Sequence, residues 1–404
     1  MALVVQKFGG TSVATPEKLK AAAERALREF RAGNKVVVVV SAMGDRTDEL
    51  IELARQIQDE PEPREMDMLM AVGEQMSVAL MAIAIHSLGG RAISLTGVQA
   101  GIHTDSVSTK AKIKSIDTGR LRRELEKGQV VIVAGFQGVD AEDNITTLGR
   151  GGSDTTAVAL AAALKADRCD IFTDVDGIYT ADPRVVPSAR KQEKVDYDEM
   201  LELASLGAKV VHSRAVEIAK RFSLPFRVRH SAGESEGTLV TNLEDFEQED
   251  VRGAALELNE AKVTIRDVPD KPGAAAAIFG EIARSHVNVD MIVQNVSDQG
   301  TTDLTFTVLK SDLPVARRVS KKLAESIGAS GVEVDENIGK VSVVGVGMKS
   351  HTGVAEKMFG ALAENKINIQ MISTSEIKIS VIVVGSRGED ALRAVHDAFE
   401  LGKD

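Results

Sequence analysis

The chain has 404 residues, of which 43% are hydrophobic and 27% are charged, and it carries 60 acidic residues against 49 basic ones for a formal net charge of −11. This composition is typical of a soluble globular protein, and the length allows two or three domains with substantial cores. The acidic surplus, without any basic stripe, argues against a nucleic-acid partner, whose phosphates require clustered lysine and arginine.

Residues 1–230 alternate between short apolar runs rich in β-branched residues and longer segments with helical periodicity. Strands are predicted over 2–7, 35–41, 91–96, 129–135, 169–174 and 226–230, and helices over 16–32, 64–88, 153–165 and 208–221. Continuous apolar runs suit strands buried on both faces, and their alternation with helices indicates a parallel sheet. The predicted fold class is α/β, with a mostly parallel sheet flanked by helices and ligands at the carboxyl ends of the strands.

A linker and an internal repeat follow this region. Residues 231–250 are polar, acidic and rich in glycine and serine, which predicts that a first domain ends near residue 245. Residues 273–292 then align without a gap with residues 353–372, sharing glycine, phenylalanine, asparagine, methionine and isoleucine at matching positions. Each copy has a β-α-β-β-α pattern, so the C-terminal part is expected to contain two similar small units.

The two copies differ at their ends. The first, over 262–337, closes with a strand at 331–337, whereas the second, from 340 to 404, stops before an equivalent strand. A strand-like run at 252–258 could complete the sheet of the second copy. The first unit would then be inserted within a second unit formed by 252–258 and 340–404. The alternative is that 252–258 is only linker.

The cysteine content and the apolar runs bear on the cellular setting. Cys169 is the single cysteine, so no intrachain disulfide can form, which fits a reducing compartment. The opening MALVVQKFGG lacks a basic leader with a long apolar stretch, and we expect no run to approach the roughly 20 apolar residues of a membrane helix. We expect a cytoplasmic protein with no membrane partner, and a buried, unreactive Cys169.

Two glycine-containing motifs are candidate anion sites. In QKFGGTSV, Lys7 ends a strand and is followed by Gly9 and Gly10, whose amides could approach a phosphate closely. No GxxxxGK[ST] loop is present, and an ordinary strand-to-helix turn remains an alternative. In TTLGRGGSDTTA, Arg150 and Asp154 flank a glycine pair before an alanine-rich helix, which suits a ligand that bears both charges. Capping of the helix explains the serine and the aspartate but not the arginine.

Further segments are weaker candidates when each is taken alone. TDVDGIYTADPRVVP, over 173–187, is a long polar loop after a strand, and VVSAMGDRTDEL, over 39–50, is again a strand, a small-residue turn and a helix. Glu74 lies within an apolar helical pattern, and Lys209 precedes a helix. Each of these segments and residues could equally lie at the surface without any role in ligand binding.

Together and in this order, these segments resemble aspartate kinase, a member of the amino acid kinase family. The C-terminal repeat resembles the paired ACT domains of such kinases. The resemblance implies phosphorylation of the β-carboxylate of L-aspartate with ATP and Mg²⁺, giving 4-phospho-L-aspartate in the first step towards lysine, threonine and methionine. It also implies feedback inhibition by lysine, threonine or both, and a homo-oligomer, at least a dimer, formed through the ACT units.

The resemblance implies roles for particular residues. Lys7, Arg150 and Asp154 would be catalytic. The ATP-binding positions would be Lys7, Phe8, Gly9, Gly10, Ser41, Thr173, Asp174, Val175, Tyr179, Thr180, Asp182, Pro183, Arg184, Lys209 and Val210. The aspartate-binding positions would be Thr47, Glu74, Arg150, Gly151, Gly152, Ser153 and Asp154. The effector-binding positions would be Ala275, Asn288, Val289, Asp290, Gln294, Asn368, Ile369, Ser375 and Glu376. No metal-ligating side chain is expected, because Mg²⁺ would arrive on ATP.

Elementary chemistry agrees with this assignment. The attacking carboxylate is already ionised at pH 7 and needs no general base, so the difficulty is the approach of one anion to another. Two alternatives remain open from the sequence. One is a related kinase acting on glutamate, acetylglutamate or carbamate. The other is a catalytically inactive sensor of amino acids that uses only the repeat.

Overall fold

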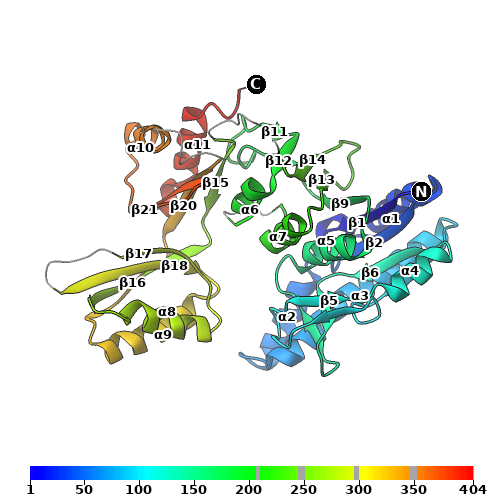
Figure 1. The fold of residues 1–404 in the computed structure, drawn as a ribbon, viewed down its shortest axis with the longest axis horizontal. Helices are drawn as coiled ribbons and strands as arrows, with labels where there is room; N and C mark the ends of the chain where they lie inside the picture. The colour runs from blue at the N-terminus through cyan, green and yellow to red at the C-terminus, as the bar shows by residue number, and fades with distance from the viewer. Residues whose placement is uncertain (206–209, 244–250, 295–299, 346–352, 404) are drawn as a thin grey trace. The chain divides into compact units, whose positions relative to one another are not determined.

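The computed structural model describes residues 1–404 except 206–209, 244–250, 295–299, 346–352 and 404 (Figure 1). The contacts within it define two units. The first comprises Met1–Ile178, Lys191–Ser205 and Lys209–Asp245, and the second comprises Tyr179–Arg190, Leu206–Ala208 and Phe246–Asp404. Residues 179–190 therefore group with the C-terminal unit, whereas the sequence expectation placed them in a first domain over 1–245.

The first unit is built on an eight-stranded sheet with the order β12-β14-β13-β9-β1-β2-β6-β3. Its continuous parallel part consists of β13 (Phe226–His230), β9 (Arg168–Thr173), β1 (Leu3–Phe8), β2 (Lys35–Val40), β6 (Val130–Ala134) and β3 (Ala92–Leu95). At the far edge, β14 (Thr238–Thr241) is antiparallel to β13, and β12 (Lys194–Asp196) is parallel to β14. The predicted α/β fold with a mostly parallel sheet is confirmed.

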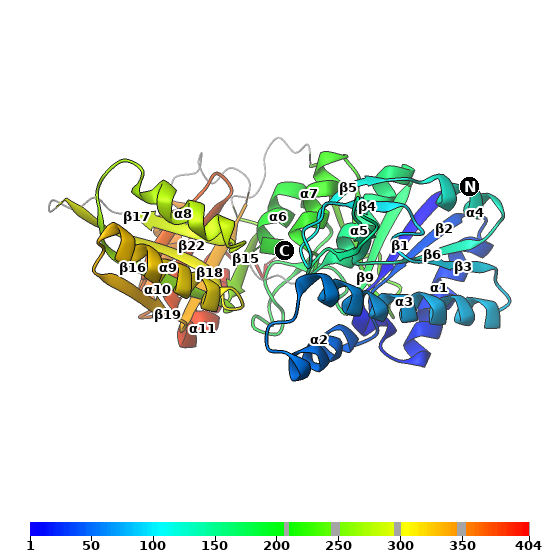
Figure 2. The same cartoon turned by 90° about the horizontal axis from the view of Figure 1, so that it is seen from below.

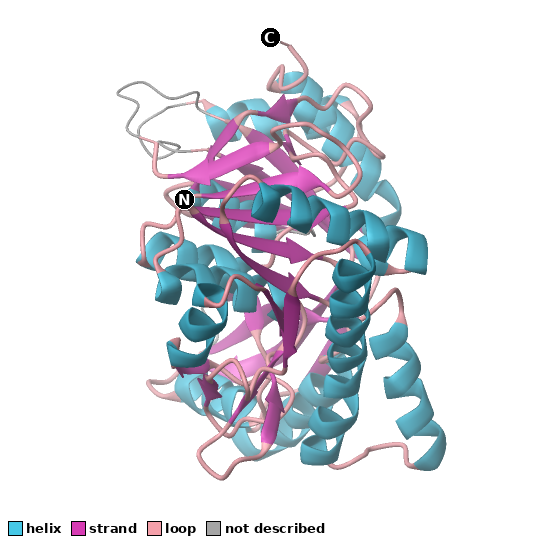
Figure 3. Cartoon of the chain, turned by 90° about the vertical axis from the view of Figure 1, so that its right-hand side faces the viewer, coloured by secondary structure: helices cyan, strands magenta, loops and turns pink. Residues whose placement is uncertain are grey.

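Helices cover both faces of this sheet (Figures 2 and 3). On one face, α1 (Pro16–Arg31) and α3 (Pro63–Ser87) pack with alternate residues of β2 and β6 into one apolar core. On the other face lie α5 (Gly152–Leu164) and α7 (Ser213–Arg221). Thr15 caps α1 by accepting from the Lys18 amide, and Pro16 fits the first turn because its missing N–H has no helical acceptor.

Helix α3 corrects one expectation from the sequence. By length and composition it is apolar enough to cross a membrane, the one such helix in the part of the chain that is described. More than half of its apolar stretch is buried, because Val78, Met81 and Ile85 pack into the core beneath the sheet. The apolar character of α3 is therefore that of a core helix.

Several shorter elements complete the first unit. They are η1 (Gly10–Val13), α2 (Arg46–Ile57), α4 (Gly119–Glu126) and α6 (Tyr197–Ser205), with a small sheet of β5 (Ile113–Ile116), β4 (Ile102–Thr104), β7 (Gln137–Val139) and β8 (Ile145–Thr147). Strands β10 (Ile178–Tyr179) and β11 (Lys191–Gln192) form a separate two-stranded sheet. The helix expected over 208–221 begins at Ser213, and part of the segment before it lies outside the described residues.

The second unit contains two four-stranded sheets that correspond to the two copies of the repeat. The first copy contains β16 (Glu260–Pro269), α8 (Ala274–Arg284), β17 (Val289–Gln294), β18 (Thr301–Leu309), α9 (Leu313–Ile327) and β19 (Gly331–Asp335), with the strand order β17-β18-β16-β19. The second contains β20 (Ile338–Val344), α10 (Val354–Glu364), β21 (Met371–Thr374), β22 (Lys378–Val384), η2 (Gly385–Arg387) and α11 (Gly388–Ala398).

Strand β15 (Gly253–Glu257) belongs to the sheet of the second copy. It pairs antiparallel with β20, which gives the order β15-β20-β22-β21. The first copy thus lies in the chain between two neighbouring strands of the other sheet. Because β15 pairs with β20, we propose that one small domain, formed by 262–337, is inserted within a second, formed by 252–258 together with 340–404.

The glycines that the two copies share have a common structural role. Gly273 and Gly353 precede α8 and α10 with φ angles of 96° and 105°. Residues with a Cβ rarely adopt this conformation, so glycine at both positions follows from the backbone.

Candidate active site

A buried ion pair marks the carboxyl edge of the central sheet. The Nζ atom of Lys7, at the end of β1, lies 2.6 Å from Oδ1 of Asp154 in the first turn of α5. Both residues are less than 10% exposed. The backbone amide of His212, which caps α7, donates to Oδ2 of the same carboxylate over 3.3 Å. Asp154 therefore fixes the Lys7 ammonium where β1 ends and ties it to two helices.

The glycine turn after Lys7 approaches its neighbours closely. The Gly9 amide donates to the Phe172 carbonyl over 3.2 Å, so this N–H is not directed at a ligand as the sequence suggested. A Cβ on Gly10 would lie 2.8 Å from the Ala42 carbonyl oxygen, so only glycine allows the β1 and β2 turns to meet. Phe8 is fully buried and stacks on Phe172 at 4.9 Å, which places its side chain in the core.

Glu74 is a buried carboxylate with spare capacity to accept hydrogen bonds. It lies on α3 and is 3% exposed, and its Oε1 accepts from the Ala42 amide over 3.1 Å. Its Oε2 is buried and has no hydrogen-bond partner in the described structure. Burial raises the pKa of Glu74 to about 7. An unpaired buried oxygen is costly, so this atom is poised for a donor that the protein itself does not supply.

The loop from Arg150 to Asp154 combines an exposed cation with a packed turn. Arg150 and Gly151 are exposed, whereas Gly152 and Ser153 are buried at the start of α5. Gly151 has a φ of 67°, and a Cβ there would lie 2.2 Å from the Cβ of His212. The Arg150 guanidinium is therefore attached to a turn that does not accommodate a side chain at Gly151.

The remaining predicted aspartate and phosphate residues lie near the same edge. Ser41 follows β2 and its amide donates to the Phe8 carbonyl over 3.1 Å. Thr47 lies in the first turn of α2 and is half-buried. The structure therefore brings the turns after β1 and β2, the start of α5 and Glu74 of α3 together within one unit.

The predicted nucleotide residues divide between the two units. Thr173 is the last residue of β9 in the first unit, and Asp174 and Val175 follow it. The Thr173 hydroxyl donates to Oδ1 of Asp174 over 2.9 Å. Val210 is half-buried and also lies in the first unit, whereas Lys209 lies outside the described residues.

The predicted residues Tyr179, Thr180, Asp182, Pro183 and Arg184 group with the second unit. The Thr180 hydroxyl contacts Nε2 of a buried histidine on α11 at 3.1 Å, so this side chain faces the interior of that unit. Arg184 pairs with Asp182 at 2.7 Å, and this bond lowers the pKa of the carboxyl. Pro183 is exposed.

The predicted effector residues lie at the exposed edges of the two small sheets. Asn288, Val289, Asp290 and Gln294 lie on or beside β17, and Ala275 lies in the first turn of α8. Asn368 and Ile369 precede β21, and Ser375 and Glu376 form the turn between β21 and β22. All nine are exposed or half-buried.

Asp290 has a partner that the sequence did not reveal. Its Oδ2 lies 2.5 Å from Nζ of Lys340 on β20, and this lysine also pairs with Glu260. Lys340 is 1% exposed, and the two carboxylates raise its pKa despite the effect of burial. A buried cation from the second copy therefore holds a carboxylate of the first.

One residue of the site, His212, was not assigned from the sequence. It was missed because it contributes a backbone amide beside Asp154, and a backbone amide has no sequence signature. No group of three or more histidine, cysteine or carboxylate side chains suited to a metal occurs among the residues that the structure describes.

Comparisons with known proteins assign the chain to a family. The amino acid kinase family profile matches residues 2–230, and two ACT domain profiles match 263–328 and 341–399. A protein named aspartokinase from Pseudomonas aeruginosa is 56% identical over 404 residues, covering 99% of this chain and 98% of that protein.

Solved structures agree with the sequence matches. E. coli aspartokinase III in complex with aspartate and ADP, called its R-state, matches with a TM-score of 0.84 and 29% identity over 98% of this chain and 99% of that one. The same enzyme in complex with lysine and aspartate, its T-state, gives a TM-score of 0.73 and 28% identity over the same shares of the two chains. The chain belongs to the aspartate kinases, members of the amino acid kinase family with two C-terminal ACT domains.

Proposed function

We propose that this chain transfers the terminal phosphoryl group of ATP to the β-carboxylate of L-aspartate, giving 4-phospho-L-aspartate and ADP. The observation that carries this proposal is the buried Lys7–Asp154 pair at the carboxyl ends of the parallel strands. An ammonium has three donors, so Lys7 can keep its bond to Asp154 and still donate to a phosphate oxygen. Lys7 would offset charge as the two anions approach each other.

Glu74 and Arg150 are suited to opposite ends of the amino acid. We propose that the free Oε2 of Glu74 accepts from the α-ammonium, since it is a buried acceptor without a partner. Arg150, exposed at the end of its glycine turn, would pair with the α-carboxylate. Thr47 and Ser153, with the turn at Gly151 and Gly152, would complete the subsite. The β-carboxylate needs no deprotonation at neutral pH, so the site has to orient it and neutralise charge.

We propose that the phosphates lie over the turns after β1 and β2, with Ser41 beside them. Because the Gly9 amide is engaged with Phe172, the amides that face phosphate would begin at Gly10. Asp174 would lie beside the nucleotide sugar, and Tyr179, Asp182, Arg184, Lys209 and Val210 would be further nucleotide residues. Mg²⁺ would enter on the nucleotide phosphates, as the family resemblance implies.

We propose that the ACT units bind lysine, threonine or both and inhibit the kinase. The lysine complex of E. coli aspartokinase III supports this for a relative. In this chain the predicted effector carboxylate of Asp290 already pairs with the Lys340 ammonium. The ammonium of an entering amino acid would therefore compete with Lys340 for Asp290. The exposed edge strands β17 and β21 suit pairing with a second chain, so we propose a homo-oligomer.

The proposal is tested by ADP release and by trapping the acyl phosphate as a hydroxamate. Wild-type protein should turn over with L-aspartate but not with glutamate, acetylglutamate or carbamate. Lysine, threonine or the two together should lower the rate, as expected for the first step of a pathway that supplies them. Binding of either effector without ATP turnover on aspartate would instead favour a sensor protein.

A further inference from the structure

Asp67 is a buried carboxylate that none of the roles proposed above uses. It lies on α3 and is 0% exposed. Its Oδ1 accepts from the Thr147 hydroxyl over 2.5 Å, and its two oxygens share the Thr109 amide over 2.9 and 3.1 Å. Burial raises the pKa of Asp67, and the bonds from the two threonines oppose that rise. Burying a carboxylate is costly unless donors surround it, so these bonds fix both threonines to α3.

Both threonines border the turn that carries Arg150. Thr147 is the last residue of β8, three positions before the arginine. Thr109 lies against the same turn, because a Cβ on Gly149 would be 3.0 Å from the Thr109 carbonyl oxygen. The Ala111 amide donates to the Thr147 carbonyl over 2.9 Å, which joins the two segments directly. The buried carboxylate is therefore bonded to both segments that support the turn with the guanidinium.

The backbone of Thr109 needs this support. Its φ is 64°, in the left-handed region that a β-branched residue rarely adopts. A residue in such a strained conformation persists only where the surrounding contacts hold it there. The bond from the Thr109 amide to both oxygens of Asp67 is such a contact. Without the carboxylate, Thr109 should relax and lose its place against Gly149.

A second helix holds the same two segments from their carbonyl groups. Arg214 on α7 donates from Nη1 to the Leu148 carbonyl and from Nη2 to the Ala111 carbonyl, the latter over 2.8 Å. The carboxylate on α3 accepts from the donors of these segments, and the guanidinium on α7 donates to their acceptors. Of these two helices, α3 is the one that also carries Glu74.

Asp67 and Glu74 are seven residues apart on α3, which is close to two helical turns, so they lie on the same face of the helix. Glu74 is assigned to the α-ammonium of the amino acid and Arg150 to its α-carboxylate. One carbon atom of the substrate bears both groups, so the two side chains have to be held at a fixed separation. An error of about 1 Å in such an arrangement can cost on the order of 100-fold.

We propose that Asp67 is a positioning residue for the amino-acid subsite, which holds the turn of Arg150 in place relative to Glu74. This inference rests on the proposed function. Asp67 is enclosed and its oxygens are engaged with the two threonines, so it acts on the substrate through Arg150 and not by contact.

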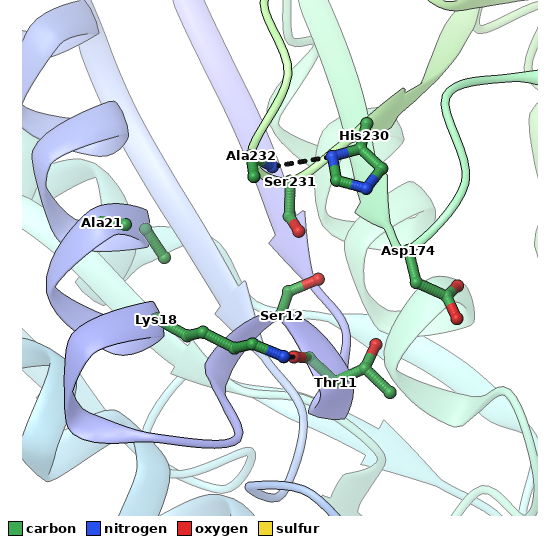
Figure 4. A pocket seen from close by; sticks show the side chains of 9 residues that line it. Thr11, Ser12, Lys18, Ala21, Asp174, His230, Ser231 and Ala232 are labelled. Atoms are coloured by element: carbon green, nitrogen blue, oxygen red, sulfur yellow. Dashed lines mark hydrogen bonds between the residues drawn. The ribbon is translucent and has the colours of Figure 1, made fainter.

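The nucleotide half of the proposed site should not depend on Asp67. A cavity there is lined by Asp174, His230 and Ser12, among others, and the buried Ser12 hydroxyl has no partner in the described structure (Figure 4). None of the residues that line this cavity is a described partner of Asp67. A substitution at Asp67 should therefore change the KM for aspartate and leave the KM for ATP unchanged.

The test compares wild-type protein with Asp67→Ala, Asp67→Asn and the matched control Asp196→Asn. Asp196 is 8% exposed and also accepts from two backbone amides, but it lies on β12 at the edge of the large sheet. Asp67→Ala should raise the KM for aspartate roughly 10- to 100-fold and change the KM for ATP less than about twofold. Asparagine keeps one acceptor oxygen, so Asp67→Asn should raise the KM for aspartate by only about three- to tenfold. Asp196→Asn should lower the Tm but keep the wild-type KM for aspartate.

A double-mutant cycle tests whether Asp67 acts through Arg150. The readout is kcat/KM for aspartate, measured at low aspartate concentration. In the Arg150→Ala background, Asp67→Ala should lower this value by less than about threefold, because the group that Asp67 positions is already absent. Equal losses with and without Arg150 would overturn the proposed role.

Failure of this inference is distinguishable from failure of the proposed function. If the wild type phosphorylates aspartate and Asp67→Ala keeps its KM within about twofold, Asp67 is not a positioning residue and the kinase function stands. Should Asp67→Ala not fold, the same criterion applies to Asp67→Asn. If calorimetry shows aspartate binding that depends on Asp67 only while Arg150 is present, without phosphorylation, the positioning role stands and the proposed function falls. Absence of any aspartate binding by the wild type would overturn both.

Discussion

Replacing Glu74 by glutamine separates the charge of this residue from its shape. Glutamine keeps an oxygen for the Ala42 amide but cannot offer a negative charge to the α-ammonium of aspartate. Loss of a charge-assisted bond in a buried site costs about 2–3 kcal/mol, which corresponds to a rise in the KM for aspartate of roughly 30- to 150-fold. The KM for ATP should change far less, because Glu74 is assigned to the amino acid.

The pH dependence follows from the raised pKa of Glu74, which is about 7 in the folded protein without ligand. Only the ionised carboxylate pairs with the ammonium, so aspartate should bind more tightly as pH rises through 7. A single ionisation with this pKa makes the wild-type KM for aspartate at pH 6 about tenfold higher than at pH 8. Glu74→Gln should lose this dependence.

The assay is initial-rate ADP release at several aspartate concentrations between pH 6 and 8.5. Glu52→Gln, an exposed substitution on α2, is the matched control and should keep the wild-type profile. If Glu74→Gln kept a KM for aspartate within about twofold of wild type at pH 8, Glu74 would not hold the ammonium. A wild-type KM that did not vary between pH 6 and 8 would contradict the role of the ionised carboxylate.

Four further outcomes are expected. Because the pKa of Glu74 is raised from 4.5 to about 7 in the folded protein, the free energy of unfolding of the wild type should fall as pH rises from about 4.5 to 7. In urea unfolding, the free energy of unfolding of Glu74→Gln should therefore increase by about 3 kcal/mol relative to that of the wild type across this pH window. Lys7→Ala should lower kcat by about 10²- to 10³-fold with a small change in the KM for aspartate, whereas the exposed control Lys20→Ala should be unaffected; near-normal kcat would disprove the role of Lys7. Arg150→Ala should mainly raise the KM for aspartate, and a change confined to kcat would speak against carboxylate binding. Gly151→Ala should lower Tm more than Gly89→Ala, since both have positive φ but a Cβ meets His212 only at Gly151; equal losses would show that the His212 contact relaxes freely.

The sequence predicted the strands of the parallel sheet because each is a continuous apolar run. The runs at 35–41 and 129–135 correspond to β2 and β6, whose residues are nearly all buried. The sheet of β4, β5, β7 and β8 was not predicted, because strands of three or four residues are too short to show a period. From the sequence, α3 was not recognised as an apolar helix of membrane-spanning length, and the burial of just over half of that apolar stretch depends on what packs around it.

The sequence predicted which motifs form the site, but it did not predict how their side chains contact one another. Lys7 and Asp154 were recognised separately, but their pairing requires β1 and α5 to meet, and residues 147 positions apart carry no sign of that. The spare oxygen of Glu74 is likewise a property of packing. Ser12 was not singled out, since a serine after two glycines is ordinary in a turn and only its burial without a partner sets it apart.

The most direct test of the central claim is a structure of the protein with a nonhydrolysable ATP analogue and aspartate bound. We predict that Nζ of Lys7 lies within hydrogen-bond distance of the terminal phosphate while Arg150 contacts the α-carboxylate and Glu74 the α-ammonium. A structure in which Lys7 kept Asp154 as its sole partner, with the phosphates bound elsewhere, would contradict this account.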